Sequence, residues 1–510
     1  VKGLMFCSSK QEAHDLASKL NQKGKPCRAL TGEDNMETRN EVVAQLEKGE
    51  LDYILTVDIF NEGIDIPSVN QVVMLRNTQS SIVFVQQLGR GLRKHESKEY
   101  VTIIDFIGNY KNNYLIPIAL FGDKSMNKDN YRRELREPNI LKGLTTINFE
   151  EVAKEQIFKS ITNTSLSNLK ILQEAYTDLE NKLGRSPLLV DYLNYNSIDP
   201  LVFFENTSFK NYVDVLNKFS KNKLVLSENE AKWLNFLTFE LLSGKRKHEL
   251  LLLDRLIKYG KVAKQDFINL LQETNLPFDK ATIASVESIL TLTFLKAQEV
   301  KKFGTSPLLI CQGSIYFLQD EFVQLLKKVE YRIAIEDITQ AGLIKSLDYP
   351  DTFTIGQKYS RRDVAKLLNW AKDEPPLNIG GYKIDKGTNS CPIFITYHKN
   401  DEINDTIKYE DELLNETTLK WFSKNKRTLM SPDVKAIVSS PTTGLDIKLF
   451  VIKDDAEGGE FYYLGNLNLI PSSVKEIIRP LEKGDESIVT MQFKLEKPIS
   501  DTLYRYITNK

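Results

Sequence analysis

The chain has 510 residues, more than a single hydrophobic core normally accommodates, and we expect about three domains. Apolar residues make up 41% and charged residues 27%, a balance typical of soluble globular proteins. Lys and Arg total 68 against 69 Asp and Glu, so the net charge of −1 excludes an overall basic nucleic-acid coat but leaves local patches open.

Residues 1–122 alternate between strand and helix patterns. Short apolar runs occur at residues 3–7, 53–57, 71–75 and 100–106, and helical patterns occur at 36–47 and 80–94. Ser9 and Glu12 have the spacing of a capping box that begins a further helix. Repeated strand–helix–strand units predict an α/β domain with a parallel sheet covered on both faces. Ligands of such sheets bind at the carboxyl ends of the strands.

Residues 123–344 have a helical pattern, and we predict an all-α domain there. Apolar residues keep a three-to-four spacing from Leu166 to Leu183, and His248–Tyr259 is a second Leu-rich segment. The sequence Gly-Arg-Ser-Pro-Leu-Leu at 184–189 is echoed by Gly-Thr-Ser-Pro-Leu-Leu at 304–309. This echo suggests a repeated helix–turn unit, although six residues do not establish a repeat.

Residues 345–510, here called the tail, contain short strand patterns separated by turn residues. One predicted helix, Arg361–Trp370, opens the region. The predicted strands lie at residues 379–384, 392–397, 446–452 and 460–464, with Gly444, Gly458 and Gly459 marking turns. This pattern predicts a compact β-barrel or sandwich decorated by helices.

The strongest chemical signal is a pair of segments in the first domain. Residues 54–67 run from a strand into a Gly-bearing turn, and residues 86–93 read Gln-Gln-Leu-Gly-Arg-Gly-Leu-Arg. Helical spacing would project Arg90 and Arg93 from one face. Two guanidinium groups on one face suit the spreading charge of a transferring phosphoryl group. The alternative is a surface arginine pair on a solvated helix, which the first segment at this distance argues against.

These segments resemble motifs V and VI of superfamily 2 helicases, and Gly3–Ser9 resembles motif IV. The resemblance covers residues 1–122 and implies the second RecA-like domain of a helicase. It implies that Arg93 is the arginine finger and that Arg90 contacts the γ-phosphate, with Gln86 and Gly89 completing motif VI. It also implies that Thr56 touches the nucleic-acid backbone and that Gly63 and Asp65 couple this contact to the nucleotide.

The other half of such an ATP site is missing from the sequence. No GxxxxGK[ST] motif occurs, since Val262 follows Gly260-Lys261, and no DExx strand end precedes motif IV. We therefore expect ATP and Mg²⁺ to be bound mainly by an upstream domain, and this chain alone not to hydrolyse ATP. The chain also begins inside a strand without an initiator Met, which indicates a piece of a larger protein. No HxKxxxxD nuclease motif is present.

The tail carries a weaker signature of aromatic residues beside polar and basic ones. Such groups hold unstacked bases and contact phosphates, so we predict nucleic-acid contacts by Trp421, Ser423, Asn425, Tyr462, Tyr463, Arg361 and Arg362. Alternatives stay open: Trp421 also suits a core position, and the two arginines also suit an exposed helix face. Tyr462 and Tyr463 alternate across a strand, so only one of them can face a ligand.

The order of domains resembles the carboxyl half of the SauUSI-type type IV modification-dependent restriction endonucleases. That resemblance implies an SRA/PUA-like, barrel-like tail that reads 5-methylcytosine in double-stranded DNA, preceded by a helical coupler. It further implies upstream ATPase and phospholipase-D-like nuclease domains in the same polypeptide, and a homodimer. No residue of the tail is assigned to a methyl pocket by motif.

Three hypotheses follow. The first is the motor half and target-recognition region of an ATP-dependent restriction endonuclease. The second is a superfamily 2 DNA or RNA helicase of repair type with a general nucleic-acid-binding tail and no nuclease. The third is a non-catalytic binding module. Four scattered cysteines without a CxxC pair and the absence of an 18-residue apolar run indicate a cytoplasmic protein without disulfides, structural zinc or a membrane span.

Overall fold

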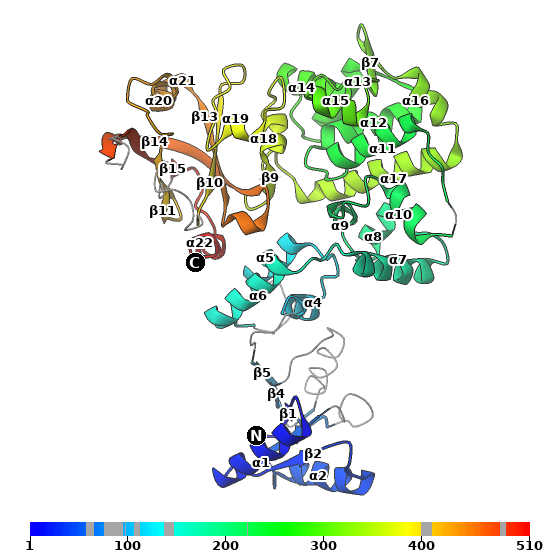
Figure 1. Cartoon of the computed structure of the whole chain (residues 1–510), viewed down its shortest axis with the longest axis vertical. Coiled ribbons are helices and arrows are strands. Elements are labelled where there is room, and N and C mark those ends of the chain that lie inside the picture. The colour runs from blue at the N-terminus through cyan, green and yellow to red at the C-terminus, as the bar shows by residue number, and fades with distance from the viewer. Residues whose placement is uncertain are drawn as a thin grey trace. The chain divides into compact units, whose positions relative to one another are not determined.

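A computed structural model describes residues 1–57, 66–75, 95–96, 98–106, 113–136, 147–221, 223–398, 411–479 and 486–509 (Figure 1). The chain forms two compact units, Val1–Leu166 and Ser167–Lys510. Among the described helices, none is both long enough and apolar enough to cross a membrane.

The first unit contains the predicted parallel sheet. Its described strands have the order β2-β3-β1-β4-β5, and every neighbouring pair is parallel. The bounds are β1 (Gly3–Phe6), β2 (Cys27–Leu30), β3 (Tyr53–Thr56), β4 (Gln71–Met74) and β5 (Thr102–Asp105), with α1 (Lys10–Gln22) and α2 (Met36–Lys48). The RecA-like prediction of a parallel sheet is confirmed. The predicted helix at 80–94 lies outside the described residues.

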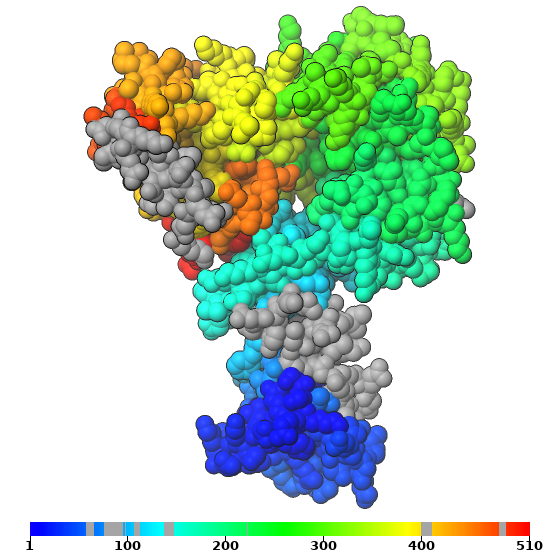
Figure 2. All heavy atoms as spheres, in the orientation of Figure 1, coloured from blue at the N-terminus to red at the C-terminus, as the bar shows by residue number. Residues whose placement is uncertain are grey.

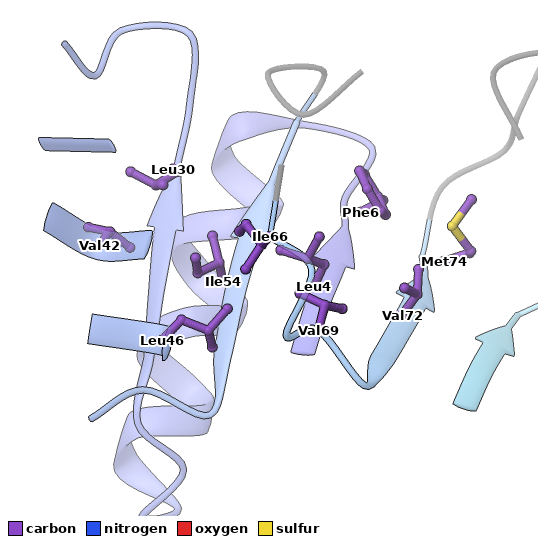
Figure 3. Close-up of a cluster of buried hydrophobic side chains, with 10 residues drawn as sticks. All are labelled: Leu4, Phe6, Leu30, Val42, Leu46, Ile54, Ile66, Val69, Val72 and Met74. Carbon is purple, nitrogen blue, oxygen red and sulfur yellow. The ribbon is translucent and has the colours of Figure 1, made fainter. Parts of the chain in front are cut away.

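Two hydrophobic clusters cover the two faces of this sheet, because neighbouring residues of a strand point to opposite sides. Ile54 packs with Val42 and Leu46 of α2, while Leu55 packs with Ala13 and Ala17 of α1. Figure 3 shows the first cluster, in which side chains from four strands, from α2 and from the segment before β4 share one layer: Leu4, Phe6, Leu30, Val42, Leu46, Ile54, Ile66, Val69, Val72 and Met74.

Among its described residues, the first unit also contains α4 (Leu115–Phe121), α5 (Lys128–Arg136) and α6 (Glu151–Asn163). They share a separate core that includes Ile118, Tyr131 and Ile157. These helices follow residue 114, so the first compact unit continues beyond the predicted boundary at residue 122. The division of the chain into three domains at 122 and 344 stays a prediction.

Helices dominate residues 167–351, here called the helical segment (green in Figure 1). The helices are α7 (Leu169–Leu183), α8 (Leu189–Asn194), α9 (Pro200–Glu205), α10 (Tyr212–Phe219), α11 (Glu228–Glu240), α12 (Lys247–Tyr259), α13 (Lys264–Glu273), α14 (Lys280–Leu290), α15 (Ala297–Phe303), α16 (Asp320–Leu325) and α17 (Val329–Lys345). The all-α prediction is not confirmed, because an antiparallel sheet also lies here. Its order is β6-β8-β7, formed by β6 (Lys261–Ala263), β7 (Leu309–Gln312) and β8 (Ile315–Leu318).

The sheet also corrects the proposed repeat. Gly184 ends α7 and its Pro-Leu-Leu continuation leads into α8, whereas Gly304 ends α15 and its continuation leads into strand β7. The two similar segments therefore share a helix end but not the element that follows it, so they do not form two copies of one unit.

The tail contains a mixed sheet with the described order β10-β13-β14-β15-β12-β11, and β9 pairs with β14. The bounds are β9 (Lys358–Ser360), β10 (Ser390–Thr396), β11 (Glu412–Asn415), β12 (Thr418–Phe422), β13 (Asp446–Ile452), β14 (Glu460–Arg479) and β15 (Glu486–Leu495). The helices are α18 (Arg361–Leu367), α19 (Pro376–Ile379), α20 (Pro432–Val438), α21 (Ser440–Thr443) and α22 (Asp501–Thr508). Strands predicted at 392–397, 446–452 and 460–464 are present, but a closed barrel is not confirmed.

Residues 379–384 do not form the predicted strand. The segment begins at the end of α19, and Gly380 has a φ of +56°. Tyr382 makes only an isolated bridge to Ile393 of β10. A left-handed residue breaks the extended backbone that a strand requires, so the alternating pattern of this segment forms a turn.

Candidate nucleic-acid and nucleotide sites

Thr56 lies at the carboxyl end of β3, the edge of the parallel sheet where ligands of this fold class bind. Its carbonyl accepts a hydrogen bond from the Cys7 backbone N–H at 2.9 Å, and its side chain is 0% exposed. The Thr56 hydroxyl has no hydrogen-bond partner among the residues that the structure describes. The other motor candidates, Gly63, Asp65, Gln86, Gly89, Arg90 and Arg93, lie outside those residues, and their roles stay predictions.

Trp421 of β12 lies in the core of the tail. Its side chain is 2% exposed and contacts Tyr382 and Phe493 edge-on, with ring centroids 5.0 and 5.8 Å away. Edge-to-face packing of this kind stabilises cores. A base would reach Trp421 only after rearrangement, so its nucleic-acid contact stays a prediction that this structure does not favour.

Ser423 and Asn425 follow Trp421 at the end of β12. The Ser423 Oγ accepts a hydrogen bond from the Val489 N–H at 3.0 Å, and the Ser423 N–H donates to the Val489 carbonyl at 2.8 Å. Ser423 is buried and holds the end of β12 against β15, while Asn425 is half-buried in the turn that follows. Their contacts with nucleic acid are likewise untested.

Tyr462 and Tyr463 are both buried, although β14 points them to opposite sides. Tyr462 packs edge-on against Tyr506, and the Lys358 Nζ lies 4.5 Å from its ring centroid. The Tyr463 hydroxyl donates to the Asn466 Oδ1 at 2.8 Å, and its ring contacts Phe450. The prediction from strand alternation, that Tyr462 and Tyr463 lie on opposite faces of the strand, is correct. Other parts of the protein cover both faces.

Arg361 and Arg362 begin α18 and are also engaged within the protein. The Arg361 guanidinium lies 4.6 Å from the ring centroid of Phe461, and burial lowers the pKa of this group. Arg362 forms ion pairs with Glu240 at 2.6 Å, with Asp373 at 3.4 Å and with Glu299. The alternative, in which both arginines lie on an exposed helix face, is therefore wrong. Phosphate contacts of the two arginines stay predictions.

A cavity of about 560 Å³ opens in the tail beside the Trp421–Asn425 segment, and we call it the lysine pocket. Lys383, Lys386 and Lys424 line it together with Tyr382 and Asp433. Sequence reasoning missed these residues, since lysine is common on surfaces and the spacing of the three lysines does not single them out. The one available signal is the position of Lys424 between Ser423 and Asn425, two residues predicted to contact nucleic acid.

Comparisons with known proteins agree with the motor prediction. Residues 1–95 match the family model of the helicase conserved C-terminal domain. Residues 172–351 and 353–507 match two models described only as domains of unknown function, DUF8090 and DUF3427.

Similar proteins are helicases. IRC3 of Saccharomyces cerevisiae, provisionally named an ATP-dependent helicase, is 25% identical over 228 residues, which are 45% of this chain and 31% of that protein. The ATP-dependent DNA helicase uvsW of Enterobacteria phage T4 is 34% identical over 79 residues, 15% of this chain and 16% of that protein. A solved structure of the Escherichia coli DEAD-box protein SrmB is 26% identical to this chain. The match covers 20% of this chain and 59% of the SrmB chain, with a TM-score of 0.19.

These matches cover 31% or less of the length of the two curated relatives. Residues 1–95 are thus a superfamily 2 helicase-type C-terminal domain, homologous to domains of ATP-dependent helicases.

Proposed function

We propose that this chain supplies the second motor domain and the target-recognition region of an ATP-dependent translocase on duplex DNA. The observation that carries the proposal is the match of residues 1–95 to the helicase C-terminal domain, over a parallel sheet with Thr56 at its carboxyl edge. Nucleotides and nucleic acids bind at this edge in doubly wound sheets.

In this proposal Arg90 and Arg93 supply guanidinium groups, which stabilise the charge of a transferring phosphoryl group. The Thr56 hydroxyl, which has no hydrogen-bond partner among the described residues, lies at the carboxyl edge of the sheet. The sequence contains no GxxxxGK[ST] motif, so the proposal assigns Mg²⁺ and the phosphate-binding loop to another domain of the same polypeptide.

The motor assignment is tested by Arg93→Ala in the polypeptide that carries both motor domains. We expect a loss of ATPase activity of about a thousandfold or more, the usual effect of losing an arginine finger. Lys48→Ala, on the exposed end of α2, serves as the control and should leave the ATPase rate unchanged. ATPase activity that survives Arg93→Ala would show that these segments are not a motor.

For the tail, the finer proposal is recognition of 5-methylcytosine in double-stranded DNA, as part of a type IV restriction endonuclease whose nuclease lies outside this chain and which acts as a homodimer. Its support is the similarity in domain order to SauUSI-type enzymes. The competing function is a helicase with a general nucleic-acid-binding tail and no nuclease. The burial of Trp421, Tyr462 and Tyr463 favours this competitor, because these rings are not presented to a base.

Binding of the 510-residue chain to methylated and unmethylated duplexes of one sequence separates the two functions. The whole chain is required, because buried ion pairs join the tail to the helical segment. A reader should prefer the methylated duplex by about tenfold, since one lost methyl contact and its cavity cost 1–2 kcal/mol. Equal affinity, or stronger binding to single strands, would reject the restriction function and leave the general clamp.

A further inference from the structure

The lysine pocket combines cationic groups with an apolar wall. Its three lysines face one aspartate, and the rest of its lining includes Ile384, Pro432, Ala436 and Leu445. Its volume of about 560 Å³ lies within the range of small-ligand sites. A ligand with one anionic and one apolar part matches this lining.

Lys424 is held in place by backbone groups. Its Nζ donates to the carbonyls of Tyr382 and Ile379 at 2.8 and 3.2 Å, and lies 4.6 Å from the centroid of the Tyr382 ring. Carbonyls take two of the three ammonium N–H donors, so a third is left to interact with a ligand. Burial lowers the pKa of Lys424, which means that its positive charge is partly desolvated. A bound anion would offset that desolvation.

Asp433 does not cancel the positive charge of the pocket, because it has cationic and hydroxyl partners of its own. Its Oδ2 accepts hydrogen bonds from the Arg427 Nε and the Tyr382 hydroxyl, each at 2.8 Å. Lys383 is paired with Glu374 at 2.6 Å, while Lys386 is exposed at the rim. The field inside the pocket is therefore set mainly by Lys424 and Lys386, and it favours anions.

Trp421 and Ser423 support the position of Lys424 in the lysine pocket. The Trp421 ring packs against Tyr382, whose backbone carbonyl and ring hold Lys424. Ser423 fixes the strand end that immediately precedes Lys424 to Val489. Both residues thus help to position the ammonium group of Lys424.

We propose that the lysine pocket binds a phosphorylated nucleotide, with its phosphate at Lys424 and Lys386 and its base against the apolar wall. The proposal rests on the proposed nucleic-acid function of the tail for its ligand class, but not on methylation or on ATP hydrolysis. Free nucleotides and nucleotides within a strand share this chemistry, so the experiment uses both.

The test measures binding of deoxycytidine monophosphate and of a short DNA duplex to the 510-residue chain. Lys386→Glu and Lys424→Met should each weaken binding by about tenfold or more, because each removes one charge-assisted contact and Lys386→Glu also adds a repelling negative charge. Each should also lower the slope of log affinity against log salt for the duplex by about one, as a lost phosphate contact does. Lys497→Glu, an exposed lysine after β15 outside the pocket lining, is the matched control and should change neither.

The two probes also identify the source of the nucleotide. Weakened binding of both probes means that a free nucleotide suffices, and weakened binding of the duplex alone means that the nucleotide must belong to a strand. Because Lys424 also bonds to carbonyls, Lys424→Arg should restore binding if its charge matters, and Lys386→Glu removes no described backbone contact. If Lys386→Glu binds both probes as Lys497→Glu does, the proposal is wrong, whatever the Arg93→Ala and methylation experiments show.

Discussion

Asp337 shows how one buried carboxylate organises the helical segment. It lies in the middle of α17, and its Oδ2 and Oδ1 accept hydrogen bonds from the backbone N–H groups of Leu189 and Val190 at 2.7 and 3.0 Å. These are first-turn N–H groups of α8, which helices leave without intrahelical partners. Burial raises the pKa of Asp337 to about 6, although the two N–H bonds oppose the shift.

Asp337 should therefore make stability depend on pH. Because its folded-state pKa of about 6 exceeds the value of about 4 in the unfolded chain, the folded state binds the proton more tightly. The stability from this group is complete below pH 4 and is lost as the pH rises through 6, by on the order of 2–3 kcal/mol. Asp337→Asn keeps the shape of the side chain and does not titrate, although it offers one acceptor oxygen in place of two, which should lower stability equally at every pH. Urea unfolding of both proteins from pH 4 to 7 measures the difference, and parallel pH profiles would contradict the assignment.

At the scale of elements, local sequence patterns correctly predict those helices and strands that are long or strictly periodic. The predicted strand at 446–452 is β13, and the predicted helix from Arg361 is α18. Strand β6 was missed because three residues show no period, and it exists through antiparallel pairing with Ile315–Phe317, more than fifty residues away. Its neighbours in space, rather than its sequence, make it a strand.

The same limit applies to the candidate site in the tail. Alternation along β12 and β14 correctly separates the two faces on which Tyr462 and Tyr463 lie, but it does not say that protein covers both. Lys424 was passed over because its importance comes from carbonyls of Ile379 and Tyr382, about forty residues earlier. For the motor, in contrast, the resemblance of residues 3–9, 54–67 and 86–93 to helicase motifs was specific enough to predict the helicase domain that residues 1–95 match.

At the scale of the whole molecule, the helical segment and the tail belong to one compact unit. Buried charges join them: the Lys245 Nζ, in the turn between α11 and α12, contacts Asp363 of α18 at 2.7 Å and Glu460 of β14 at 2.5 Å. Burial alone would lower the pKa of Lys245, but these two carboxylates raise it well above its usual value. In the view of Figure 2, the yellow atoms of the tail meet the green atoms of the helical segment without a gap.

A tail fixed by ion pairs cannot turn freely against the helical segment, so a ligand in the tail and the helices around α17 should respond as one body. Gly244, in the same turn as Lys245, fits so closely that a Cβ there would lie 2.5 Å from the Gly342 carbonyl oxygen at the end of α17. The turn is thus held between α17, which leads into the tail, and α18 of the tail itself.

Lys245→Met tests whether the ion pairs make the two parts one body. The substitution leaves Asp363 mostly buried without its ammonium partner, which should cost about 3 kcal/mol of unfolding free energy. Lys258→Met, on the exposed side of α12, is the matched control and should cost no more than about 0.5 kcal/mol. Hydrogen exchange should show the start of α12 and α18 losing protection together in Lys245→Met, because the lost ion pair joins the turn before α12 to α18. If α18 alone loses protection, or if residues 167–344 and 345–510 already unfold in separate transitions in the unaltered chain, then the ion pairs do not couple the tail to the helices.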